Sequence, residues 1–157
     1  MRIALIADIH GNSIAFDAVL ADAAEQHPDS YLFLGDLVDG HDPSGVVERI
    51  CSLPHTQCIF GNTEQYILTG NGPPPYTVRD IPHHLDRLPQ FQQGTASWAW
   101  SKGWLCATGW IDWVAQLPRE VHIALPNGQT LLGVHAMPGY ADGPGIGPHI
   151  TDAELTT

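Results

Sequence analysis

The chain has 157 residues, with 17 Asp and Glu against 6 Lys and Arg, and a formal net charge of -11 at pH 7. This length suits a single domain, and a hydrophobic share of 43% allows a buried core. The acidic balance argues against non-specific binding to nucleic acid or to an anionic membrane, because such binding depends on many basic side chains. A bound metal ion can still supply the local positive charge that a phosphate group needs.

The three cysteines, Cys51, Cys58 and Cys106, are an odd number without a C-x-x-C pair. A disulfide framework needs paired cysteines, so this pattern predicts free thiols and a cytoplasmic location. The apolar start of the chain is too short for a signal peptide, and no apolar run reaches the length that spans a membrane.

The first part of the chain alternates short apolar runs with segments of helical spacing. The first run is continuous, which predicts a buried parallel strand. The segment after it carries Ile14, Ala18 and Ala21 at helical spacing. Strands and helices are expected in turn at residues 2–7, 13–25, 31–34, 44–53, 56–60 and 63–68. This alternation predicts an α/β layer architecture with parallel strands.

The pattern changes at residues 71–94, where three consecutive prolines and a pair of histidines predict a long loop. The following segment, residues 95–116, holds all five tryptophans. We expect one domain over residues 1–157, in which residues 71–117 form a cap or insert over a site.

The tryptophan segment also carries a helical signal. Trp110, Trp113 and Leu117 fall at i, i+3 and i+7, which predicts at least one helix, with breaks at Gly103 and Gly109. Contacts in the core or between subunits of a homo-oligomer explain these aromatic residues better than a base-stacking platform, which needs basic neighbours.

The last part of the chain contains a hairpin signal and a helix-start signal. Asn127-Gly128 lies between apolar runs at residues 120–125 and 129–134, which favours a β-hairpin. Thr151 and Glu154 match the capping box S/T-x-x-E. Because only three residues follow Glu154, we expect a helix to begin where the chain stops and the domain to be incomplete at its C-terminus.

Polar clusters follow four of the predicted strands. Ligands bind beyond the carboxyl ends of the strands in open α/β sheets, so these clusters are expected to meet at one edge. Singly, each cluster is more often an ordinary loop pair or turn; their joint position favours a site. Asp, His and Asn ligands suit Mn²⁺, Fe or Zn²⁺ better than Ca²⁺. The clusters are Asp8-x-His10, Gly35-Asp36-x-x-Asp39, Gly61-Asn62-Thr63-Glu64 and His135.

These clusters resemble the calcineurin-like metallophosphoesterase superfamily, whose pattern is D-x-H, G-D-x-x-D, G-N-H-D/E, H and G-H-x-H. The resemblance implies a β-sandwich flanked by helices and a bacterial-type phosphodiesterase or phosphatase with two divalent metal ions. It places Asp8 and His10 on the first metal, Asp36 on both, and Asn62 with His135 on the second.

Three departures from the family pattern bear on activity. Thr63 stands where many members carry a histidine that is taken as a general acid, and a hydroxyl is far too weak an acid to replace it. Gly40-His41 stands where the protein phosphatases have Arg-Gly, so a phosphate-clamping Arg is absent there. No G-H-x-H follows His135, which agrees with an incomplete domain.

The resemblance implies that a metal-bridging hydroxide attacks a phosphodiester or phosphomonoester directly. Asn12, Asp39 and Glu64 are expected to orient ligands or substrate from behind the metal ligands. His41 is a candidate proton donor on the substrate side, although a solvated loop histidine is the commoner case. Without imidazole at Thr63, a diester or an activated ester is favoured over a simple alkyl monoester.

Two alternative functions are consistent with parts of the pattern. A non-catalytic or weakly active metal- or phosphate-binding domain would keep the fold without turnover, and the weak metal binding expected of this incomplete domain agrees with it. An amidohydrolase barrel needs eight strand–helix units and does not fit in 157 residues.

Overall fold

The computed structural model describes residues 1–73, 77, 79 and 81–143. Its first half is a three-stranded parallel sheet in the order β1-β2-β3, formed by β1 (Ile3–Ile6), β2 (Ser30–Phe33) and β3 (Thr56–Cys58). The register places Ile6 opposite Phe33 and Phe33 opposite Cys58, so all three strands end at one edge. The predicted alternation of parallel strands and helices is therefore confirmed.

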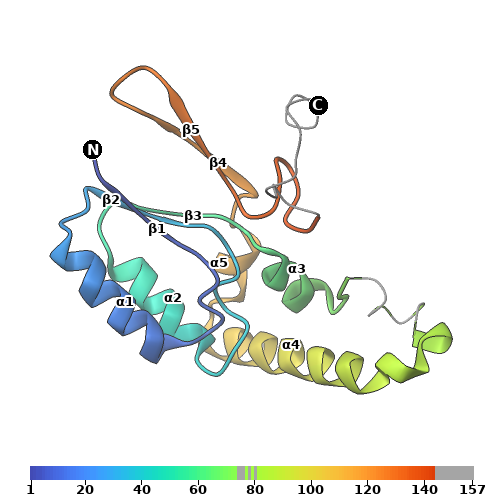
Figure 1. The fold of residues 1–157 in the computed structure, drawn as a ribbon. Helices are drawn as coiled ribbons and strands as arrows, with labels where there is room; N and C mark the ends of the chain where they lie inside the picture. The colour runs from blue at the N-terminus through green and yellow to red at the C-terminus, as the bar shows by residue number, and fades with distance from the viewer. Residues whose placement is uncertain (74–76, 78, 80, 144–157) are drawn as a thin grey trace.

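Two helices, α1 (Ser13–Glu25) and α2 (Pro43–Ser52), cover one face of this sheet (Figure 1). The ring of Phe16 on α1 meets that of Phe33 edge to face, with centroids 5.7 Å apart. The predicted helix is confirmed, but Ile14 is 76% exposed instead of facing the core. Phe16, Leu20 and Ala23 form the core-facing stripe, because the large Phe16 ring sets which side of the helix meets the sheet.

The predicted hairpin, β4 (Glu120–Ala124) and β5 (Thr130–Val134), is antiparallel and lies on the other side of the sheet (Figure 1). A Cβ at Gly133 would lie 3.2 Å from the Leu32 side chain, so β5 packs closely on β2. Leu5 on β1 remains 57% exposed. The other residues of β1 are only partly buried, so the expectation of a fully buried first strand is wrong, since β1 is at the sheet's edge.

The segment between α3 (Asn62–Thr69) and the hairpin is mainly helical. Two short 3-10 helices, η1 (Ile81–His83) and η2 (Leu85–Arg87), lead into α4 (Leu88–Thr108), and α5 (Ile111–Ala115) follows. The predicted loop over residues 71–94 is thus wrong from η1 onward. The predicted break at Gly103 is also wrong, because glycine inside a helix is only modestly costly. Gly109 does end α4, with φ 81°.

The tryptophans divide into two groups. Trp98, Trp110 and Trp113 pack against the buried core cluster, as the interpretation of core contacts predicted. Trp100 and Trp104 are 54% and 39% exposed on α4.

Across the residues that the structure describes, no helix is both long and apolar enough to cross a bilayer. The last two residues of the proline run and the capping box at residues 151–154 lie outside the described residues.

Candidate functional site

The loops that follow β1 and β2 are joined by backbone hydrogen bonds. The amide of Asp8 donates to the carbonyl of Gly35 at 3.1 Å, and the amide of His10 donates to the carbonyl of Asp36 at 3.0 Å. These bonds continue the parallel pairing past the ends of the strands. They bring three of the predicted metal ligands, Asp8, His10 and Asp36, to the same edge of the sheet.

All three of these residues have a left-handed backbone. Their φ angles are 57° at Asp8, 50° at His10 and 54° at Asp36. Such angles raise the conformational free energy of a non-glycine residue by about 1 kcal/mol or more, and they are found most often at functional sites. The strained backbone turns the three side chains out of the strand direction and toward one another.

The three side chains form a group that can hold a cation. One ligand atom from each of Asp8, His10 and Asp36 lies within 4.8 Å of the others. The Nε2 of His10 is 3.8 Å from Asp8 Oδ1 and 3.7 Å from Asp36 Oδ2. Ligand atoms held about 2.1 Å from a shared tetrahedral ion lie roughly 3.4 Å apart, so the observed spacing is close to that of a metal site.

A second ligand group lies on the other side of Asp36. The ring of His135 donates from Nδ1 to the carbonyl of Leu34 at 2.7 Å, since that carbonyl can only accept. Its Nε2 then lies 2.8 Å from Asn62 Oδ1 and 3.4 Å from Asp36 Oδ1. A neutral His135 would therefore direct a lone pair at two other acceptors. A cation placed among them resolves this conflict, so the donor set fits a metal.

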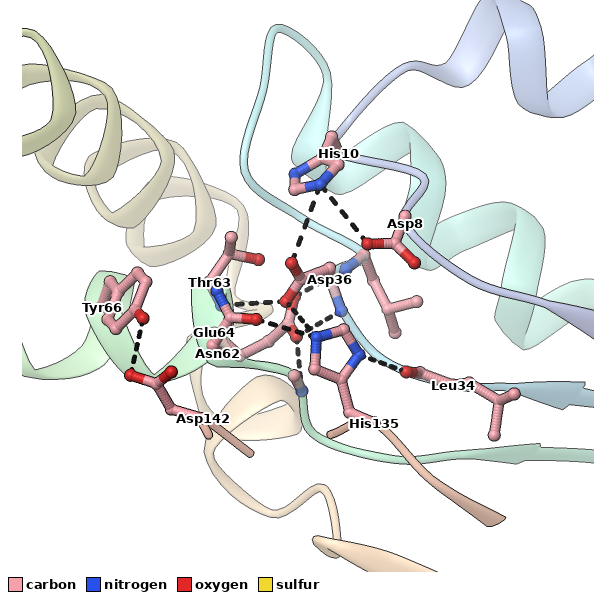
Figure 2. A network of polar contacts seen from close by, with 12 residues as sticks. Asp8, His10, Leu34, Asp36, Asn62, Thr63, Glu64, Tyr66, His135 and Asp142 are labelled. Carbon is pink, nitrogen blue, oxygen red and sulfur yellow. Dashed lines mark hydrogen bonds and ion pairs between the residues drawn. The ribbon is translucent and has the colours of Figure 1, made fainter. Parts of the chain in front are cut away.

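Asp36 connects the two groups, as Figure 2 shows. Its Oδ2 faces His10, while its Oδ1 faces His135 and accepts the backbone N–H of Thr63 at 2.9 Å. Asp36 is only 4% exposed, so the orientation of its carboxylate is fixed by these neighbours. The structure thus brings together all five residues predicted as metal ligands, Asp8, His10, Asp36, Asn62 and His135.

Glu64 lies beneath the site and is completely buried. Its carboxylate accepts backbone N–H groups from both strand-end loops: Asp36 at 2.9 Å, Leu37 at 2.7 Å, Val38 at 3.1 Å and Gly61 at 2.8 Å. Burial and the neighbouring Asp36 raise the pKa of Glu64, whereas the backbone donors favour its ionised form. One side chain therefore fixes the loop that carries the shared carboxylate.

Glycines allow the two loops to approach this closely. A Cβ at Gly61 would lie 2.3 Å from both the amide nitrogen and the Oδ1 of Asp36. A Cβ at Gly35, where φ is 88°, would lie 2.7 Å from the Cα of Gly61. Only a residue without a side chain fits at either position.

The residues predicted to act from behind the ligands have different surroundings. Asn12 caps α1, since its Oδ1 accepts the amide of Ala15 at 3.0 Å. Asp39 accepts the hydroxyl of Ser97 on α4 at 2.7 Å. His41 is exposed in the loop that precedes α2. Roles for these three side chains in orienting ligands or substrate stay predictions.

Thr63 and Tyr66 extend the site along α3. Within the described part of the chain, Thr63 Oγ1 is a buried side-chain oxygen without a hydrogen-bond partner. Tyr66 was not predicted from the sequence; its hydroxyl donates to Asp142 at 2.8 Å. Burial, reinforced by that bond to Asp142, raises the pKa of Tyr66, so the phenol stays neutral at physiological pH. The spacing of Tyr66 three residues after Thr63 is a signal that could have found it.

The comparisons with known proteins agree with this geometry. The family model described as calcineurin-like phosphoesterase matches residues 1–155. Among solved structures, the chain is similar to the crystal structure of a metallophosphoesterase from Sphaerobacter thermophilus, with a TM-score of 0.53 and 24% identity. The similarity covers 77% of this chain and 43% of that one, so the chain spans less than half of that protein's length. A search of curated proteins finds no match. The expected mixed α/β metallophosphoesterase fold is confirmed.

Proposed function

Because the chain belongs to the calcineurin-like phosphoesterase family, we propose that it is a metal-dependent hydrolase of phosphoric esters that uses two divalent metal ions. The observation that carries this proposal is the carboxylate of Asp36, whose two oxygens face two separate groups of ligand atoms. A carboxylate in this position is suited to bridge two cations. The substrate is a phosphodiester or a phosphomonoester.

In this proposal, Asp8, His10 and Asp36 hold one ion, and Asp36, Asn62 and His135 hold the other. The mixed nitrogen and oxygen donors favour Mn²⁺, Fe or Zn²⁺. Divalent ions, when bound, supply the positive charge that holds a phosphate ester and the acidity that makes water nucleophilic at neutral pH. The protein itself supplies little such charge, since the chain carries a formal net charge of -11.

The protein's own residues orient these ligands. The hydrogen bond from His135 Nδ1 to Leu34 fixes the tautomer that leaves Nε2 free to coordinate, and such contacts usually tune metal affinity. Glu64 keeps Asp36 in place through backbone amides. Asp39 and Asn12 are the candidates for orienting ligands or substrate.

The leaving group must leave without strong acid catalysis from α3. A threonine hydroxyl at position 63 does not protonate an alkoxide at neutral pH as an imidazole would. We therefore propose an ester with an acidic leaving group, as in an activated or aryl phosphodiester. His41 is the candidate donor if protonation is needed, because it is the exposed histidine of the loop that also carries Asp39.

The test is hydrolysis of bis(4-nitrophenyl) phosphate by the protein with added Mn²⁺. We expect turnover that chelator abolishes and that Asp36→Ala removes, with two Mn²⁺ per chain by calorimetric titration. Failure to bind any divalent metal would contradict the proposal.

A second candidate function is a metal- or phosphate-binding domain without turnover. It is favoured by Thr63 and by a set of only three protein ligands for each ion among the described residues. Two bound Mn²⁺ ions per chain, together with no hydrolysis of any ester tested, would support this alternative. A cytoplasmic location, a homo-oligomer and a single domain with a cap at residues 71–117 stay predictions.

A further inference from the structure

We propose that a pocket between α3 and α4, beside the metal ligands, binds a flat, uncharged aromatic group carried by the phosphoric ester. This inference rests on the proposed function and names its substrate class. The pocket is lined chiefly by Asp39, Thr63, Tyr66, Phe91, Gly94 and Trp98, and has a volume of about 320 Å³. That volume lies within the range of pockets that hold small molecules.

The two walls of the pocket come from regular elements. Thr63 and Tyr66 lie one turn apart on α3. Phe91, Gly94 and Trp98 lie at i, i+3 and i+7 on α4, so they share one face of that helix. Three aromatic side chains on two packed helices therefore line the pocket, and Asp39, from the loop after β2, completes its lining.

The Trp98 ring is held in place before any ligand arrives. Its centroid lies 5.1 Å from that of Tyr66, at an interplanar angle of 48°. The backbone of Gly72 also approaches the ring so closely that a Cβ there would overlap it. A Cβ at Gly94 would lie 3.3 Å from the ring, so a larger side chain at this position would fill the pocket. A rigid aromatic wall loses little conformational entropy on binding.

The pocket opens next to the proposed phosphate position. Thr63 connects the two, because its backbone N–H donates to Asp36 Oδ1 and its side chain lines the pocket. An ester whose phosphorus lies near Asp36 would place its substituent past Thr63, toward Trp98. The hydroxyl of Thr63 is buried and has no hydrogen-bond partner among the residues that the structure describes.

The charges around the pocket decide which substituent fits. Among the described residues that line it there is no Lys, Arg or His. Its one charged group, Asp39, already accepts a hydrogen bond from Ser97. A second phosphate or a carboxylate would be repelled there, whereas a neutral ring can stack on Trp98 and Phe91. Aryl and nucleobase-bearing esters are therefore the substrate class.

The experiment compares two phosphonates that are not hydrolysed, phenylphosphonate and methylphosphonate. Their dissociation constants for the 157-residue protein are measured by calorimetry in the presence of Mn²⁺. We expect phenylphosphonate to bind about tenfold more tightly, the order of magnitude of an aromatic contact. Trp98→Ala and Phe91→Ala should each reduce this preference to about threefold or less. Trp100→Ala, on the exposed face of the same helix, should leave it unchanged.

Three results would overturn the inference. Equal affinity of the wild-type protein for both phosphonates, or a full preference in Phe91→Ala, would refute the aromatic pocket while leaving the metal centre intact. Binding of neither phosphonate in the presence of Mn²⁺ would refute the proposed function together with it. Phe91 is outside the core cluster, so its variant tests the pocket even if Trp98→Ala fails to fold.

Discussion

The Oδ1 of Asp36 lies 3.4 Å from the Nε2 of His135, although Asp36 follows the second strand and His135 follows the last one described. The hairpin is responsible for this contact, because β5 packs against β2 and places His135 beside the carbonyl of Leu34. The contact completes the second ligand group around one shared carboxylate.

Replacing the shared carboxylate should remove both ions. In Asp36→Asn we expect the stoichiometry of Mn²⁺ to fall from two per chain to none, with a loss of affinity of at least 100-fold, because an amide neither carries charge nor bridges two cations well. Calorimetric titration measures this. Asp22→Asn, an exposed residue on α1, is the matched control and should bind as the wild type does. Retention of both ions in Asp36→Asn would contradict the bridging role.

Glu64 should matter for stability even without metal. Glu64→Gln turns an amide NH₂ toward backbone donors and leaves some of them unpaired, so we expect the free energy of unfolding to fall by about 2–4 kcal/mol. Urea unfolding in the presence of chelator measures this without a contribution from bound ions.

The control for this variant is Glu48→Gln on α2, where the side chain is exposed. Its free energy of unfolding should change by less than about 0.5 kcal/mol. Equal stabilities of the two variants would show that the four backbone contacts of Glu64 contribute nothing.

A methyl group at Gly61 should disrupt the site through sterics alone. The backbone at Gly61, with φ -101°, is open to any residue, but the Cβ of Gly61→Ala would overlap Asp36. We expect a loss of about 1–3 kcal/mol in the free energy of unfolding, together with weaker Mn²⁺ binding. Gly103→Ala meets no atom within 4 Å and lies inside α4, so it should stabilise the protein by about 0.5–1 kcal/mol. Loss of stability in both variants would argue against this steric reason.

The cysteines should differ in reactivity as the pH is raised. Burial raises the pKa of Cys58 from a usual value of 9.0 to about 12. A raised pKa lowers the thiolate fraction at a given pH, so at pH 8 Cys58 should react with iodoacetamide about a thousandfold more slowly than an ordinary thiol. Its rate should keep rising about tenfold per pH unit well above pH 9, where an ordinary thiol levels off.

Mass spectrometry of alkylated peptides identifies the modified residue. Cys106 is exposed and serves as the internal reference. In urea the two residues should react at similar rates, because the protection of Cys58 depends on the fold. Rapid modification of Cys58 in the native protein would contradict the protection that its partial burial on β3 gives.

Much of the local structure could be predicted from the sequence, and the failures have identifiable causes. The helical spacing of the apolar residues predicted the helix at residues 13–25. It did not predict that Phe16, and not Ile14, faces the sheet. A pattern of helical spacing takes no account of side-chain volume, and the large ring of Phe16 fills more of the core than a smaller side chain would. A helix was predicted in the tryptophan segment, but its continuity through Gly103 was not, because packing of α4 against other helices overrides a weak local preference.

The candidate site shows the same division. The types of the candidate ligands and their position after strands could be predicted from the motifs, because each short motif carries its own chemistry: carboxylates and imidazoles, with a glycine where the chain must turn. Tertiary packing, which no local motif specifies, brings His135 to Asp36, lets Glu64 bind two loops through four backbone amides, and places Trp98 against Tyr66 beside Thr63. These relationships join residues far apart in the chain, and they exist only once helices and the hairpin have packed on the two faces of one sheet.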